Sequence, residues 1–252
     1  MAPAWRRAKG FLRAGAEFVW PSRSLVSGER SGIAGALSPD EWAALTFLGR
    51  VVCQRCGLPQ DLDLGEETLC AACLARPPHW RRARAALVYD EASRRPILEL
   101  KHAGRRDGLK VMGNWMTEAG RDLIAGAELI VPVPLHYRRL VKRGYNQAGW
   151  LAAAISRQSG VAMHPAILRR TRPTRTQGGL NTRERRRNVA GAFAVPPRMG
   201  GRVDGRHVLL VDDVLTTGAT LNGCARALKR AGAASVDVLV LARVVRPRDV
   251  TI

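Results

Sequence analysis

The chain has 252 residues, 46% of them hydrophobic, and its 41 Lys and Arg against 21 Asp and Glu give a formal net charge of +20. Its length and apolar content exclude a disordered chain and a small domain that depends on disulfides for its core. No apolar run approaches the ~18 residues of a membrane span, and the first twenty residues lack the apolar segment of a secretory signal, so we expect a cytoplasmic protein without a transmembrane segment.

The basic excess predicts a polyanionic partner, either nucleic acid or a small phosphorylated substrate. A genomic preference for Arg is an alternative explanation for the choice of Arg over Lys, since only five lysines are present. That preference does not explain the excess of basic over acidic residues.

Residues 5–19 have apolar side chains at helical spacing, with Arg and Lys between them. They predict a helix that docks against the body of the protein or, alternatively, lies on a membrane surface. Docking is favoured because the stretch is short and ends at Trp20 and Pro21.

Four of the five cysteines form two Cys-x-x-Cys pairs that are separated by 13 residues: Cys53, Cys56, Cys70 and Cys73. Without an export signal, this clustering favours metal binding over disulfides. Two such pairs present four thiolates to one tetrahedral Zn²⁺, so we predict one structural zinc ion. The fifth cysteine, Cys224, falls on a predicted helix and is interpreted as a small buried residue.

The preceding segment has similar spacing, with Ser24, Ser27, Ser38 and Glu41 in place of four ligands. Serine hydroxyls do not ionise near neutral pH and are poor zinc ligands, so we expect this half to be free of metal. A loop whose small residues match by chance is the alternative.

After Pro77 and Pro78, apolar strands alternate with helical patterns, which predicts a parallel sheet with right-handed crossovers. We expect strands near 85–89, 128–133, 208–211 and 236–245, and helices or helical turns near 95–102, 108–126, 145–159 and 219–231.

The segment 208–220 carries the most specific pattern. Four apolar residues predict a buried strand, and Asp212 and Asp213 then emerge at its carboxyl end, where ligands bind in open α/β sheets. Residues 216–220 form a turn of small residues that opens the next helix, where backbone N–H groups can surround a phosphate. A phosphate-binding turn beside two carboxylates suits a sugar phosphate.

This run resembles the phosphoribosyl-pyrophosphate (PRPP) signature of type I phosphoribosyltransferases. The resemblance implies that Asp212 and Asp213 bind the ribose hydroxyls, directly or through Mg²⁺. It also implies that the 5′-phosphate lies in a phosphate loop formed by Thr216, Thr217, Gly218, Ala219 and Thr220. Purine-salvage members have an Asp that acts as a base at the position of Thr216. A threonine cannot do that near neutral pH, which disfavours an oxopurine acceptor.

Residues 131–147 and 176–188, with Lys101 and His102, are similar to the ComF/GntX family, which joins a type I phosphoribosyltransferase fold to an N-terminal double zinc ribbon. The first ribbon is degenerate here. The resemblance implies an α/β phosphoribosyltransferase fold with a small zinc-ribbon module, an N-terminal helix and metal-free ribbon at 1–50, a zinc ribbon at 51–76 and the α/β domain at 77–252.

In this fold the loop after Val133 receives pyrophosphate, so its candidate ligands are Pro134, Arg138, Arg139 and Arg143. A solvated face that leads a helix is the alternative for these arginines. Residues 169–187 carry eight arginines and one acid, and they include the further candidates Arg183 and Arg187. This basic segment fits a loop that closes over PRPP or, equally, one that follows a nucleic-acid backbone. His136 is interpreted as a hydrogen-bonded loop residue rather than as a catalytic base.

We expect a Mg²⁺-dependent phosphoribosyltransferase that releases pyrophosphate. The alternative is a competence-related module that handles single-stranded DNA, in which the PRPP site is a sensor or remnant. A scaffold in which the ribbon recruits a protein is a third possibility. The sequence does not define the acceptor, which a hood formed by residues 77–110 and the ribbon would select, or the oligomeric state.

Overall fold

The computed structural model of the chain describes residues 24, 29, 37–62, 68–102, 106, 108–172 and 191–246. The predicted N-terminal helix, Ser27, Arg183, Arg187 and most of the basic segment lie outside the described residues.

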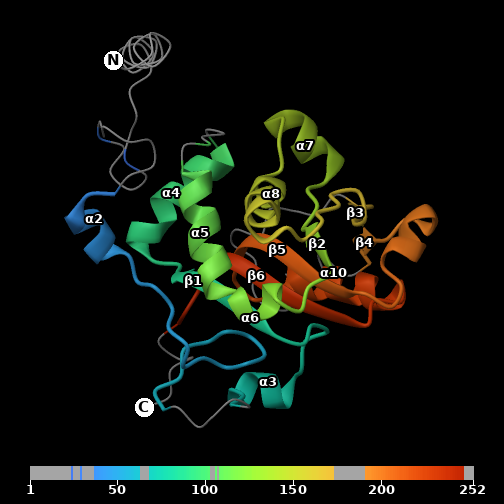
Figure 1. Cartoon of the computed structure of the whole chain (residues 1–252), viewed down its shortest axis with the longest axis horizontal. Helices are drawn as coiled ribbons and strands as arrows, with labels where there is room; N and C mark the ends of the chain where they lie inside the picture. The colour runs from blue at the N-terminus through green and yellow to red at the C-terminus, as the bar shows by residue number, and fades with distance from the viewer. Residues whose placement is uncertain are drawn as a thin grey trace, which may run out of the picture.

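A four-stranded parallel sheet with the strand order β1-β6-β5-β2 lies at the centre of the fold (Figure 1). Its strands are β1 (Ala83–Val88), β2 (Leu129–Pro132), β5 (His207–Leu215) and β6 (Ser235–Arg243). A short parallel bridge between Ile130 and Met163 extends the β2 edge. The parallel sheet confirms the predicted α/β class.

Helices cover both faces of the sheet. On one face lie α5 (Leu109–Ala119) and α8 (Gln147–Ser159), and on the other lies α10 (Ala219–Arg230). The remaining described elements are α2 (Pro39–Ala44), α3 (Ala71–Ala75), α4 (Glu91–His102), α6 (Arg121–Ile124), α7 (Tyr137–Arg143), the hairpin strands β3 (Arg169–Arg170) and β4 (Phe193–Ala194), and the 3₁₀ helix η1 (Pro197–Arg202).

Alternation along the strands divides the apolar core into two clusters. Val208 and Leu210 of β5 belong to the cluster with α10, whereas Leu209 and Val211 belong to the cluster with α5 and α8. All four side chains are at most 2% exposed. Burial of each contributes about 1.5–3 kcal/mol, and burial on both faces explains the unbroken apolar run in the sequence.

The strand that precedes the candidate phosphate loop is longer than predicted. We expected it over 208–211, but β5 continues to Leu215, because Val214 and Leu215 pair with Ala242 and Arg243 of β6. The two acids therefore lie within the strand, and alternation directs their side chains toward opposite faces of the sheet. The helix α7 was not predicted, because its apolar residues Tyr137, Leu140 and Val141 are exposed and do not form a buried helix face.

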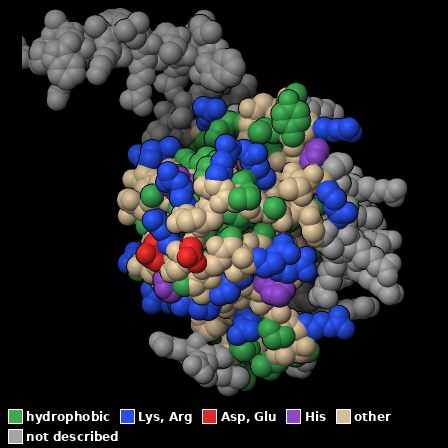
Figure 2. Space-filling view, turned by 90° about the vertical axis from the view of Figure 1, so that its right-hand side faces the viewer, with side chains coloured by type: hydrophobic (Ala, Val, Ile, Leu, Met, Phe, Trp, Pro, Cys, Tyr) green, Lys and Arg blue, Asp and Glu red, His purple; other side chains and the backbone are tan. Residues whose placement is uncertain are grey.

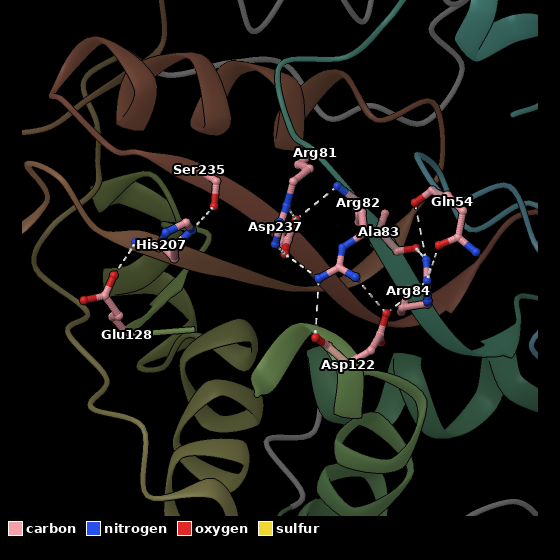
Figure 3. A network of polar contacts seen from close by, with 10 residues as sticks. All are labelled: Gln54, Arg81, Arg82, Ala83, Arg84, Asp122, Glu128, His207, Ser235 and Asp237. Carbon is pink, nitrogen blue, oxygen red and sulfur yellow. Dashed lines mark hydrogen bonds and ion pairs between the residues drawn. The ribbon is translucent and has the colours of Figure 1, made fainter. Parts of the chain in front are cut away.

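A network of charged side chains joins β1 to β6 and α6 (Figure 3). Asp237 is 5% exposed and pairs with Arg81 at 2.5 Å and with Arg82 at 3.4 Å. The hydrogen bond to Asp237 raises the pKa of Arg81 above its ordinary value. Arg82 and Arg84 both pair with Asp122, and Arg84 also donates to the carbonyl of Gln54 in the cysteine-bearing segment. The network thus fixes that segment against β1.

Candidate functional site

The acid pair lies near the carboxyl end of β5. Asp213 is 5% exposed, and its backbone N–H donates to Oδ1 of Asp212 at 2.9 Å. Oδ2 of Asp213 accepts a hydrogen bond from Nε2 of Gln147 at 3.0 Å and pairs with Nζ of Lys101 at 3.3 Å. α4 and α8 therefore supply a cation and an amide that hold this carboxylate in place.

Asp212 is difficult to ionise. Burial, followed by the charge of neighbouring Asp213, raises its pKa to about 8 from an ordinary value of 3.8. Lys101 and Arg170 act in the opposite direction. A cation or a hydroxyl donor that enters this site would favour the charged form of Asp212.

The phosphate loop turns directly into α10. Gly218 caps this helix with φ = +72°, in the left-handed region that favours glycine. A Cβ at Gly218 would lie 2.7 Å from the indole of Trp80, so a larger residue would displace that ring. Oγ1 of Thr217 is buried without a hydrogen-bond partner among the described residues.

A cavity of 340 Å³ brings together most of the predicted site residues. It is lined by both acids and by four of the five loop residues, Thr216, Gly218, Ala219 and Thr220. Pro134, Arg139 and Arg143 line the same cavity. Exposed Arg138 and half-buried Thr217 do not line it, and Arg183 and Arg187 lie outside the described residues.

The loop after β2 is fixed on the sheet beside this cavity. The N–H of Val133 donates to the carbonyl of Val211 at 2.9 Å, and Nδ2 of Asn146 donates to the carbonyl of Val133 at 3.0 Å. Nδ1 of His136 accepts from the N–H of Arg138 and caps α7, which agrees with its interpretation as a hydrogen-bonded loop residue.

Further polar residues line the cavity without having been predicted as ligands, among them Lys101, Gln147 and Arg170. Lys101 and Gln147 fall in stretches that carried the family resemblance, but no local pattern assigned them a role. Arg170 comes from β3, where burial, then the charge of Arg139, lowers its pKa. Gln147 also accepts from Nη1 of Arg143 at 3.0 Å, which connects this α7 arginine to Asp213.

The four clustered cysteines converge. Their sulfur atoms all lie within 4.8 Å of one another, and all four side chains are buried. The N–H of Cys70 donates to Sγ of Cys53 at 3.3 Å. The first pair closes a tight turn at Gly57, where φ is +69° and an added Cβ would lie 3.0 Å from the carbonyl oxygen of Ala83. Soft sulfur donors at this spacing could hold a zinc ion.

Hydrogen bonds from Cys56, and then from Cys73, keep the pKa of Cys53 well below its ordinary value. The bond to Cys53 raises the pKa of Cys56 to about 12, and the bonds to Cys53 and Cys56 raise that of Cys73. These three thiols thus share negative charge rather than each carrying one. A bound cation would favour their ionised form.

The degenerate half, the segment that carries Ser24, Ser27, Ser38 and Glu41 in place of cysteines, repeats part of this arrangement with oxygen atoms. Cys70 is the N-cap of α3 and Cys73 occupies its third position, and Ser38 and Glu41 hold the same places in α2. The Ser38 side chain and Glu41 form a reciprocal capping box, and Oγ of Ser24 donates to Oε1 of Glu41 at 2.5 Å. Hydrogen bonds therefore join three of the four positions, while Ser27 lies outside the described residues.

The parallel sheet with helices on both faces is the fold of a type I phosphoribosyltransferase domain. Consistent with this, residues 123–250 match the family model of the phosphoribosyl transferase domain.

Among curated proteins, the DNA utilization protein YhgH of Escherichia coli (strain K12) is 34% identical over 218 residues, which cover 79% of this chain and 86% of YhgH. Competence protein F of Haemophilus influenzae is 33% identical over 179 residues, 69% of this chain and 78% of that protein. Competence protein ComFC of Bacillus subtilis (strain 168) is 24% identical over 221 residues, 82% of this chain and 86% of ComFC. The chain belongs to the ComF family of proteins with a phosphoribosyltransferase domain. In the part that the structure describes, no helix is both long and apolar enough to span a membrane.

Proposed function

We propose that this protein binds PRPP with Mg²⁺ and transfers its phosphoribosyl group to an acceptor with release of pyrophosphate. The observation that carries the proposal is the single cavity that holds the acid pair, most of the phosphate loop and the arginines Arg139 and Arg143 of α7. Each of these groups has the chemistry that one part of PRPP requires.

In this proposal the backbone N–H groups of residues 216–220 bind the 5′-phosphate at the amino end of α10. Asp212 and Asp213 accept hydrogen bonds from the ribose hydroxyls or bind the cation. Carboxylate oxygens are the ligands that Mg²⁺ prefers, so the acid pair fits this ion. When bound, Mg²⁺ would supply positive charge to the pyrophosphate oxygens.

The transfer breaks the bond between C1 of the ribose and the pyrophosphate oxygen, and pyrophosphate leaves with the electron pair. A lone pair of the acceptor forms the new bond to C1. Arg139 and Arg143 would stabilise the charge of the leaving pyrophosphate, and Arg138, Arg183 and Arg187 are further candidates for this role. Such positioned charges lower the barrier without a covalent intermediate.

Replacement of Asp213 by Asn tests the proposal, because it removes the charge that faces Lys101. We expect the PRPP–Mg²⁺ dissociation constant to rise about 10- to 100-fold, the effect of losing hydrogen bonds to a charged group. Isothermal titration calorimetry measures it. Asp122→Asn is the matched control, because Asp122 is likewise a carboxylate paired with basic side chains, Arg82 and Arg84, but does not line the cavity. Unchanged PRPP affinity in Asp213→Asn would show that the site is assigned wrongly.

The second candidate function is the handling of single-stranded DNA, and the names of the relatives and the net charge of +20 favour it. Lys and Arg are spread over the face seen in Figure 2, and few acids accompany them. Tyr145 and Trp150 stack on each other at 4.2 Å, and Arg106 covers the Trp150 ring at 4.3 Å. The faces of Trp150 are therefore occupied, so this ring is not available for base stacking, and the basic side chains would bind DNA through its phosphates.

DNA binding of this kind should weaken steeply with salt, with a log–log slope of about −0.7 for each phosphate neutralised on a single strand. Charge reversal at Arg185, Arg186 and Arg187 should then reduce both the affinity for an oligonucleotide and the slope. Fluorescence anisotropy at several salt concentrations measures both quantities. Intact DNA affinity together with weaker PRPP binding in that variant would favour the transferase over DNA handling.

We further infer one structural zinc ion held by Cys53, Cys56, Cys70 and Cys73, and no metal in the degenerate half. The division into 1–50, 51–76 and 77–252 and the cytoplasmic location stay predictions.

A further inference from the structure

A second cavity, of 510 Å³, lies between the cysteine-bearing segment and the phosphate loop. Its walls come from α3, from the linker that carries Pro77, Pro78 and Trp80, from the first turns of α10 and from the end of β6. Thr216, Gly218 and Ala219 line both this cavity and the one that holds the acid pair. The phosphate loop is therefore the partition between the two cavities.

Apart from two of the clustered cysteines, Cys56 and Cys73, the ionisable side chains that line this second cavity are basic. Arg76, Arg226 and Arg243 line it, and none of its described lining residues is acidic. Arg243 is 8% exposed, and its Nε is buried without a hydrogen-bond partner among the described residues. Nε of Arg226 and Oγ1 of Thr217 are likewise buried without a hydrogen-bond partner among the described residues. Buried donors without acceptors predict a ligand that supplies acceptors.

The cysteine cluster accounts for only part of this charge. Arg243 donates to the carbonyl of Cys56, and its charge offsets a small part of the rise in the pKa of that thiol. Arg226 instead extends from α10 on the same side as Ala219, Asn222 and Gly223, which all line the cavity. Residues at this spacing share one helix face, so Arg226 faces the cavity from the phosphate-loop side.

The cavity also has an apolar wall. Trp80 is 6% exposed and is held by a hydrogen bond from its Nε1 to the carbonyl of Arg55 at 2.6 Å. Its ring lies against Gly218 and, with Pro77, Pro78 and Leu215, gives the cavity a surface that suits a flat apolar group.

We propose that this second cavity binds the acceptor of the phosphoribosyl group and that the acceptor carries a carboxylate or phosphate beside a flat apolar portion. The inference rests on the proposed function, because it places the acceptor across Thr216 from the ribose. The acceptor lone pair bonds to C1 as the C1–pyrophosphate bond breaks, and the proton of the acceptor passes to water. Arg226 and Arg243 hold the anionic group and take no part in the bond change.

The first test uses 8-anilinonaphthalene-1-sulfonate, an aromatic anion whose fluorescence rises on binding, with the full chain. We expect Arg226→Gln to raise its dissociation constant about 10-fold, the effect of losing one charge-assisted hydrogen bond. Arg230 is exposed and lies one turn further along α10, outside the cavity. Arg230→Gln makes the same charge change there and should alter the dissociation constant of the probe less than twofold. Equal effects of the two substitutions, or competitive displacement of the probe by PRPP, would overturn the second site.

The second test measures pyrophosphate release from PRPP and Mg²⁺ with aromatic carboxylates, aromatic phosphates and their neutral amides or dephosphorylated forms. We expect only the anionic compounds to accelerate release, and we expect Arg226→Gln to raise their KM while leaving the KM for PRPP unchanged. Comparison of the carboxylate and phosphate series identifies the group. Acceleration by the neutral forms, or by none of the compounds, would overturn the acceptor role.

Calorimetry separates this inference from the proposed function. A wild-type protein that binds no PRPP refutes the proposed function, whatever the probe shows. Normal PRPP binding together with equal effects of Arg226→Gln and Arg230→Gln refutes only the second cavity.

Discussion

Asp212 is held in a position that opposes its own ionisation. Its pKa of about 8 lies far above the ordinary 3.8, because burial and the charge of Asp213 disfavour a second negative charge. Between about pH 4 and pH 8 the folded protein therefore keeps a proton that the unfolded chain loses. The free energy of unfolding must fall as the pH rises through that window.

The variant Asp212→Asn tests this reasoning, because an amide is neutral at every pH. We expect wild type and variant to be similarly stable near pH 4, and the variant to be more stable by a few kcal/mol at pH 8, since one pKa unit corresponds to about 1.4 kcal/mol. Urea unfolding without Mg²⁺ at several pH values measures the difference. Asp61→Asn, at an exposed position, is the control. Parallel pH profiles for wild type and Asp212→Asn would contradict the assignment.

The local sequence predicted the acid pair and the phosphate loop as a unit, because a strand, two acids and a small-residue turn are contiguous. It did not single out Lys101, Gln147 or Arg170, which come from α4, α8 and β3 and meet Asp213 or the cavity only through the fold. Lys101 and Gln147 fall in stretches that resemble the family, and Arg170 lies in the basic segment 169–187, but no local pattern assigned any of the three a role at this site. Contacts across 66 or more positions of the chain, such as that between Gln147 and Asp213, are set by how the helices pack on the sheet.

At the scale of elements, the buried strands and α10 were predictable from their apolar residues. The strands are short continuous apolar runs because both faces of the sheet are buried, and α10 has apolar residues at helical spacing. The helix α7 was not predictable, because its apolar residues face outward and its length is set by the cap at His136 and the left-handed Gly144. The hairpin of β3 and β4 pairs only Arg169 and Arg170 with two residues more than 20 positions later. Such a short pairing leaves no periodic pattern.

The turn from β5 into α10 depends on Gly218 for two separate reasons, its positive φ and the contact with Trp80. Gly191 has a similar φ of +65°, but an added Cβ there would meet nothing within 4 Å. Gly191→Ala thus measures the backbone strain alone, which we expect to lower the free energy of unfolding by about 1–3 kcal/mol. Gly218→Ala should lower the free energy of unfolding by more than Gly191→Ala does, and it should also weaken PRPP binding. Equal losses of stability in the two variants would show that the Trp80 contact is unimportant.

At the scale of the whole molecule, the cysteine-bearing segment has little apolar core of its own. Its buried cluster consists of the four cysteines and Leu58, with Leu69 and Val245 packed beside them. The α/β core contains none of the four clustered cysteines. The segment should therefore depend on its metal for folding, whereas the sheet and its helices should not.

We accordingly predict one zinc ion per chain in the wild type, one in Cys224→Ser and none in Cys56→Ser, as measured by elemental analysis. Both substitutions change a buried thiol, but Cys224 lies in the α10 core cluster away from the other four. Hydrogen exchange should show that amides in 51–76 lose protection in Cys56→Ser while those of β5 and β6 keep it. Two zinc ions per chain in the wild type would mean that the serine-containing half also binds metal. A wild-type protein without zinc would show that the cysteines do not hold the ion. Loss of protection in β5 would show that the two parts fold as one unit, joined through Arg243 to Cys56 and through Arg84 to Gln54.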